Sequence, residues 1–178
     1  FEKRRSEAKK RGKLLGLGVS NNVESATPPG QEWAKIEIDR EGNALLFAGS
    51  TDQGQGHATM YTQIMCEQLG LEPEQVHVVE GDTATLDAGG GAGGSKVSGL
   101  GGSAVYVTSD LILEKGKELA AEKLESAIAD IEYKDHVFSI VGTDRSVCWR
   151  ELAKSTPARE WLVVGTHKTD APTFPSGS

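Results

Sequence analysis

Cysteine is nearly absent from this 178-residue sequence. Its two cysteines, Cys66 and Cys148, stand far apart and belong to no Cys-x-x-Cys or Cys/His pattern. Two thiols cannot hold an iron–sulfur cluster, and the spacing does not fit a zinc site, so neither centre is expected within this chain. The same scarcity favours a reducing compartment, and we expect a cytoplasmic location.

Long apolar runs are missing as well. No run approaches the roughly 20 residues that a membrane-spanning helix needs, and the charged start contains no apolar core of a secretion signal. We therefore expect no membrane span.

The chain also has fewer positive than negative side chains, because 19 Lys and Arg stand against 26 Asp and Glu for a net charge of −7. The chain as a whole thus has no electrostatic attraction for nucleic acid.

The basic residues that do occur gather at the beginning of the chain. Six of the first eleven residues are Lys or Arg, and Gly12 follows them, which is typical of a solvated helix with a glycine stop. A nucleic-acid-binding arm is the alternative, but no aromatic residue is interleaved with these charges. The chain starts without Met and ends in a Pro/Gly/Ser stretch. We therefore expect one domain fragment, 1–178, of a longer protein, with 1–12 and 170–178 as candidate excised ends.

Hydrophobic patterning in the first half predicts strands and one amphipathic helix. Strands are expected over 14–23, 33–39, 44–48 and 76–79, and the Asp39-Arg-Glu-Gly-Asn43 turn predicts a hairpin between the second and third. A helix is expected from Gly56 to a cap at Gly70. Its core-facing stripe comprises Met60, Tyr61, Ile64, Met65 and Leu69.

The second half predicts a long helix and several short elements. Helical spacing runs from Leu100 to about residue 129, where Gly116 costs about 1 kcal/mol relative to Ala. Two short strands are expected within 131–141, a short helix over 149–154 and a strand over 161–164. Together these elements predict an α+β fold in which a mixed or antiparallel sheet is packed by two main helices.

Two glycine-containing loops precede the two main helices. In the first, Gly54 and Gly56 flank Gln55, and a glycine backbone can lie directly against a ligand. The following helix N-terminus favours anions, and the Gln55 amide can donate and accept hydrogen bonds. A plain strand-to-helix turn with Gln55 in solvent is the alternative.

The second loop reads Gly-Gly-Gly-Ala-Gly-Gly-Ser-Lys over 89–96. It matches the dinucleotide fingerprint formally, but eight residues separate it from the strand that should precede it. It is not a P-loop, because Ser95 and Lys96 occur in the reverse order. Two loops that each lead into a helix could still hold a large anionic cofactor, with side-chain donors from Gln55, Thr83, Ser95 and Ser98.

Two stretches resemble a known family. "GSTDQGQGHATMYTQIMCEQLGLEPEQVHVVEGDT" at 49–83 and "GGSKVSGLGGSAV" at 93–105 are similar to the cofactor-binding region of the large subunit of molybdenum hydroxylases, the family of xanthine dehydrogenase, aldehyde oxidase and aerobic carbon monoxide dehydrogenase. The resemblance implies a molybdenum-pterin cofactor, often a cytosine dinucleotide in bacteria. It also implies an oxidoreductase that hydroxylates an aldehyde, N-heterocycle or carbon monoxide with water-derived oxygen, and partner subunits that carry iron–sulfur clusters and FAD.

The resemblance also assigns residues. It implies that Gln55 contacts the cofactor or a metal oxo ligand, with Gly54 and Gly56 beside it. The backbone of Gly94, Ser95, Lys96 and Val97 would line the pterin and phosphate side, although Lys96 and Val97 depart from residues common in the family.

The family's catalytic glutamate lies in a GxGE-like motif, and none occurs here. We therefore expect no catalytic residue and no metal ligand in this chain, which should be inactive when isolated. The four histidines, His57 among them, are expected on the surface or satisfied by hydrogen bonds. Glu80 and Asp82 are expected to end a strand and begin a turn. Two alternatives stay open: a glycine-loop module that binds an anionic ligand or a partner without redox chemistry, and a purely structural domain.

Overall fold

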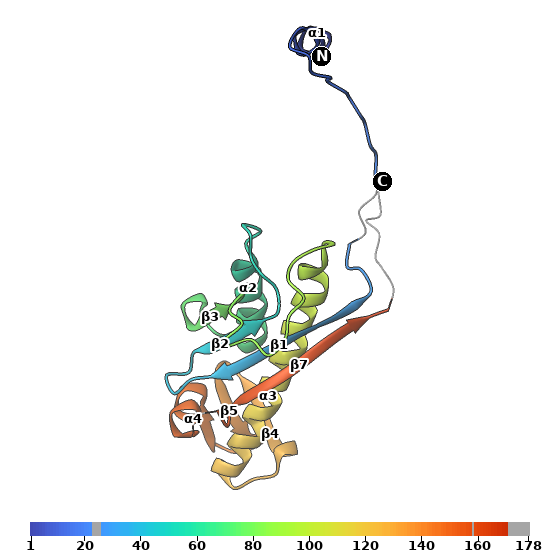
Figure 1. Cartoon of the computed structure of the whole chain (residues 1–178). Helices are drawn as coiled ribbons and strands as arrows, with labels where there is room; N and C mark the ends of the chain where they lie inside the picture. The colour runs from blue at the N-terminus through green and yellow to red at the C-terminus, as the bar shows by residue number, and fades with distance from the viewer. Residues whose placement is uncertain (23–25, 158, 171–178) are drawn as a thin grey trace.

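The computed structural model describes residues 1–22, 26–157 and 159–170. Its main feature is a four-stranded sheet in the order β3-β2-β1-β7 (Figure 1). The strands span Gly30–Ile38 (β1), Ala44–Ala48 (β2), Val76–Val79 (β3) and Leu162–Thr169 (β7). Strand β1 is antiparallel to β2 and β7, whereas β2 is parallel to β3. The mixed sheet of an α+β fold is thereby confirmed.

The predicted hairpin joins β1 to β2. The Asp39 carboxylate accepts hydrogen bonds from the backbone N–H groups of Glu41 (2.9 Å) and Asn43 (2.8 Å). Gly42 adopts φ 86°, in the left-handed region that favours glycine. Polar turn chemistry therefore fixes the register of this strand pair.

Two helices cover one face of the sheet, as predicted (Figure 1). They are α2 (His57–Leu69), which ends at Gly70 with φ 71°, and α3 (Gly102–Leu124). The stripe residues Tyr61, Met65 and Leu69 are buried in the same hydrophobic cluster as Ala34, Ile36 and Ile38 of β1, and α2 itself packs against α3 and β3. The predicted helix end near residue 129 is wrong, because Glu125 turns into the left-handed region at φ 50°. A π-helical turn, η2 (Val97–Gly101), precedes α3.

A second, antiparallel sheet lies beside the C-terminal half of α3. It comprises β4 (Ile131–Lys134), β5 (Val137–Ile140) and β6 (Ser146–Cys148), followed by α4 (Trp149–Ser155). Single 3-10 turns, η1 (Pro73–Gln75) and η3 (Ile128–Asp130), precede β3 and β4. Four packed aromatic rings join this sheet to the core: Tyr133, Phe138, Trp149 and Trp161. The strand β6 was not expected.

The N-terminal helix α1 (Glu2–Lys10) lies apart from the sheets (Figure 1). The predicted strand over 14–23 is wrong for 14–22, where the chain forms neither helix nor strand, while residue 23 lies outside the described residues. Leu14 and Val19 are 97% and 91% exposed. A strand needs a neighbour for its backbone hydrogen bonds, and none pairs with this segment in the described part of the chain.

Candidate functional site: a cavity between two glycine loops

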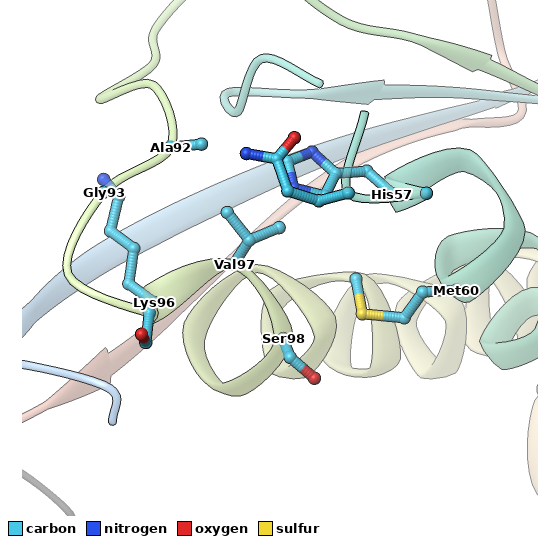
Figure 2. Close-up of a pocket in the computed structure, with 10 residues that line it drawn as sticks. His57, Met60, Ala92, Gly93, Lys96, Val97 and Ser98 are labelled. Carbon is cyan, nitrogen blue, oxygen red and sulfur yellow. The ribbon is translucent and has the colours of Figure 1, made fainter. Parts of the chain in front are cut away.

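The two glycine-containing loops meet at one cavity of about 530 Å³. The first loop runs from β2 to α2 and the second from β3 to η2 and α3. Figure 2 shows His57 and Met60 of α2 facing Val97 at the start of η2. The lining residues are Gln55, Gly56, His57, Met60, Ala92, Gly93, Ser95, Lys96, Val97 and Ser98.

The Asp52 carboxylate shapes the first loop. It accepts backbone N–H groups from Gly54 (2.7 Å), Gln55 (2.8 Å) and His57 (3.1 Å). The hydrogen bond from Gly54, with those from the other two residues, lowers the pKa of Asp52 below its ordinary value of 3.8. Gly54 and Gly56 have φ values of 106° and 79°. Glycine flanks Gln55 because side chains rarely tolerate these backbone angles.

The Gln55 side chain is exposed at the cavity. Its oxygen accepts a hydrogen bond from the backbone N–H of Gln53 at 2.5 Å. This contact orients the amide within its own loop. The NH2 group is then the donor that Gln55 can offer to a bound group.

A buried polar network supports the start of α2. Ser50 Oγ lies 2.9 Å from the Tyr61 hydroxyl and donates a hydrogen bond to Glu80 Oε1. His57 Nδ1 lies 3.1 Å from the same carboxylate oxygen. Burial raises the pKa of Tyr61 to about 12. His57 is thus a histidine satisfied by a hydrogen bond, as expected, but Glu80 does more than end a strand.

Asp52, His57 and Glu80 also place potential metal-ligand atoms within 4.8 Å of one another. Each of these groups already has hydrogen-bond partners. Asp52 accepts three backbone N–H groups, and Glu80 contacts both Ser50 and His57. These contacts account for the cluster without a cation, so we assign no metal ion to it.

The second loop lies against the sheet through its glycines. Gly91 N donates to Gly49 O at 3.1 Å, and a Cβ on Gly89 would lie 2.5 Å from the same oxygen. The Lys96 amine lies 2.5 Å from Glu32 Oε1 on β1. The loop then enters η2 and α3 from a sheet in which only β2 and β3 are parallel among the described strands. This is not the βαβ setting of a dinucleotide fingerprint.

The structure brings most of the predicted site residues together. Gln55, Gly56, Ser95, Lys96, Val97 and Ser98 line the cavity, whereas Gly54, Thr83 and Gly94 do not. The predicted cofactor contacts did not include four further lining residues, although Ala92 and Gly93 belong to the second glycine loop and His57 follows the first: His57, Met60, Ala92 and Gly93. Met60 belongs to the predicted core stripe, and it does pack against the core from its partly buried position. Its position one turn after the first glycine loop was the sequence signal that could have placed it at the cavity.

The chemistry of the cavity fits an anionic group. The helical segments α2 and η2 both begin at it. The Asp52 carboxylate already accepts the first backbone N–H group of α2, from His57, whereas the cap residues Gly56 and Lys96 themselves make no side-chain cap hydrogen bond. Helix N-termini present backbone N–H groups and partial positive charge. None of the described residues that line the cavity is acidic, and Gln55, Ser95 and Ser98 add polar donors.

The chain is similar in sequence to the large subunits of known enzymes. The carbon monoxide dehydrogenase large chain of Hydrogenophaga pseudoflava is 29% identical over 167 residues, which cover 90% of this chain and 19% of the relative. The nicotine 6-hydroxylase large subunit of Paenarthrobacter nicotinovorans is 33% identical over 158 residues, covering 82% of this chain and 19% of the relative. The chain thus spans about a fifth of the length of these relatives.

Solved structures share the fold. A Cu,Mo-CO dehydrogenase in its carbon monoxide reduced state aligns with a TM-score of 0.75 and 28% identity, over 97% of this chain and 24% of that one. The quinoline 2-oxidoreductase from Pseudomonas putida 86 aligns with a TM-score of 0.65 and 26% identity, over 98% and 24%. The model of the molybdopterin cofactor-binding domain matches residues 1–176. This match favours cofactor binding over a ligand module without redox chemistry, and the chain belongs to the molybdopterin cofactor-binding domain family.

Proposed function

We propose that this chain supplies one wall of the molybdenum-pterin site in the large subunit of a molybdenum hydroxylase. The observation that carries the proposal is the cavity itself. Two loops that are separate in the sequence meet there, and two helical N-termini border it. The cofactor would supply the redox centre that hydroxylates a carbon atom with water-derived oxygen. This chain's residues would bind and orient it.

Backbone groups would make most of the contacts. Those at Gly56 and at Ser95–Ser98 in the second loop border the cavity, and the Gln55 NH2 group would donate a hydrogen bond to the cofactor or to a metal oxo ligand. Contacts from Gly54, Thr83 and Gly94 stay proposals for the site enclosed by the whole subunit. The cytosine dinucleotide form is proposed from the resemblance, and a cavity of about 530 Å³ bordered by two helical N-termini suits a phosphate group of either form.

The remaining parts of the enzyme would come from outside this chain. We propose that the rest of the large subunit supplies the catalytic glutamate, and that partner subunits or domains carry the iron–sulfur clusters and FAD. The substrate class would be an aldehyde, an N-heterocycle or carbon monoxide. A cytoplasmic location is also proposed, and the free thiols Cys66 and Cys148 are compatible with it.

Substitution of Gln55 in the full-length subunit tests the proposal. Gln55→Ala removes a partly charge-assisted hydrogen bond worth roughly 1.5–3 kcal/mol, so molybdenum retention or turnover should fall about ten- to hundredfold. Gln55→Glu should be worse, because a carboxylate would face an anionic cofactor. Gln63→Ala, at an exposed position of α2, is the matched control. Unchanged molybdenum content and turnover in both Gln55 variants would contradict the proposal.

A further inference from the structure

The second glycine loop passes from one face of the main sheet to the other. Side chains alternate along β1, so Glu32 shares the helix-covered face with Ala34, and Lys35 lies on the opposite face. The loop contacts both of these charged residues. Between the two contacts it crosses Gly49, the residue that follows β2. The loop therefore wraps around the end of β2.

The contact on the open face anchors the beginning of the loop. Lys35 Nζ lies 2.8 Å from Asp87 Oδ2 and donates to the backbone oxygen of Thr85 at 3.3 Å. The Asp87 side chain is 73% exposed. An ion pair with one solvent-exposed partner contributes little to stability, so this contact holds the beginning of the loop only weakly.

The contact on the helix-covered face is of a different kind. Lys96 Nζ lies 2.5 Å from Glu32 Oε1, and the two side chains are only 18% and 6% exposed. Removing one member of such a pair leaves a buried charge without compensation, which is strongly unfavourable. Lys96 also occupies the N-cap position of η2, so the ion pair lies directly before the π-helical turn that leads into α3.

We infer that the Glu32–Lys96 ion pair is a positioning pair, which holds the backbone of the second glycine loop in the conformation that receives the cofactor. The inference rests on the proposed function. Lys96 lines the cavity, yet its amine pairs with the Glu32 carboxylate on β1. In this role it does not contact the phosphate or pterin of the cofactor. Its neighbours Val97 and Ser98 then present their backbone to the cavity in a fixed position.

Three variants of the full-length subunit test this role: Lys96→Met, the charge-exchanged Glu32→Lys/Lys96→Glu, and the control Lys115→Met. Lys115 forms a half-exposed ion pair with Glu118 on α3, away from the cavity. The readouts are amide hydrogen exchange over 89–98, measured without cofactor, and molybdenum per subunit after loading. Lys96→Met should accelerate exchange at least about tenfold and lower the molybdenum content. The exchanged pair should restore most of both, and Lys115→Met should change neither.

Two results would overturn the inference. If Lys96→Met loses molybdenum while loop exchange is unchanged, and the exchanged pair does not recover it, Lys96 contacts the cofactor directly. If exchange accelerates while the molybdenum content stays normal, the pair does not position the site. Neither result removes the proposed function, which fails only if both Gln55 variants keep normal molybdenum content and turnover. Should Lys96→Met not fold, the exchanged pair decides: a molybdenum-loaded subunit supports the role, and a folded subunit without molybdenum contradicts it.

Discussion

His57 Nδ1 lies 3.1 Å from Glu80 Oε1, so the first residue of α2 is joined to the residue that follows β3. Both side chains are almost completely buried. Ser50 and Tyr61 extend the network to the end of β2 and into the first turns of α2. The helix N-terminus that borders the cavity is thereby fixed to two neighbouring strands.

Replacing Glu80 by Leu should destabilise the protein. Ser50 and His57 would lose their acceptor in a buried position, at a cost of about 1–3 kcal/mol in the free energy of unfolding. Urea denaturation measures the change. Glu67→Leu, at an exposed site on α2, is the control. Equal midpoints for the Glu80 variant and the unmodified protein would show that the network adds nothing to stability.

Tyr61 should make the protein sensitive to alkaline pH. Its pKa is raised from 10.0 to about 12, mainly by burial, so the unfolded chain loses this proton first. The contribution of Tyr61 to stability is therefore complete below pH 10 and is lost as the pH rises toward 12. Tyr61→Phe should show a shallower decline in thermal stability over this interval. Parallel curves for the two proteins would contradict the assignment.

Asp52→Asn should loosen the first loop. Asn keeps one oxygen acceptor, but its amide nitrogen cannot accept a second hydrogen bond in place of the other carboxylate oxygen. If the retained oxygen keeps the two hydrogen bonds from Gly54 and Gln55, amide exchange at His57, whose N–H group loses its acceptor, should accelerate, while the exposed control Asp110→Asn leaves it unchanged. Because the pKa of Asp52 is lowered from 3.8, its stabilising contribution is present above that pH and is lost as the pH falls below it.

Gly116→Ala should destabilise the protein although Ala is the better helix former. An added Cβ would lie 2.5 Å from Phe138 Cζ and 2.8 Å from Trp161 Cζ2. Trp161 is almost completely buried, so the rings cannot move freely, and we expect a loss of about 1–3 kcal/mol. The exposed substitution Glu122→Ala should be near neutral or stabilising. A stabilised Gly116 variant would show that helix propensity dominates here.

Local signals in the sequence predicted the elements that local chemistry determines. Asp39 and Gly42 specify the hairpin, and Gly70 ends α2, because these residues satisfy nearby backbone groups or adopt left-handed angles. The strand expected at 14–23 had the right apolar content. Apolar content alone does not supply a partner strand, and the described residues supply none.

Contacts between distant segments could not be predicted in this way. Strand β7 pairs with β1 from the other end of the chain and is longer than its apolar core suggested. The shared cavity was anticipated, since both loops lead into helices on one sheet. The partners of Glu32 and Glu80 were not anticipated. The local sequence around a carboxylate does not indicate which amine or imidazole from a distant segment will pair with it.

The helix α3 connects the cavity to the three-stranded sheet. Its 23 residues make it about 35 Å long, and it begins where η2 leaves the cavity. Its other half packs on the three-stranded sheet through Gly116 and the aromatic rings around it. A helix held at both ends transmits a tilt along its whole length. Substitutions in β4, β5 or α4 that tilt α3 should therefore shift the rim of the cavity, where the proposed function places the cofactor.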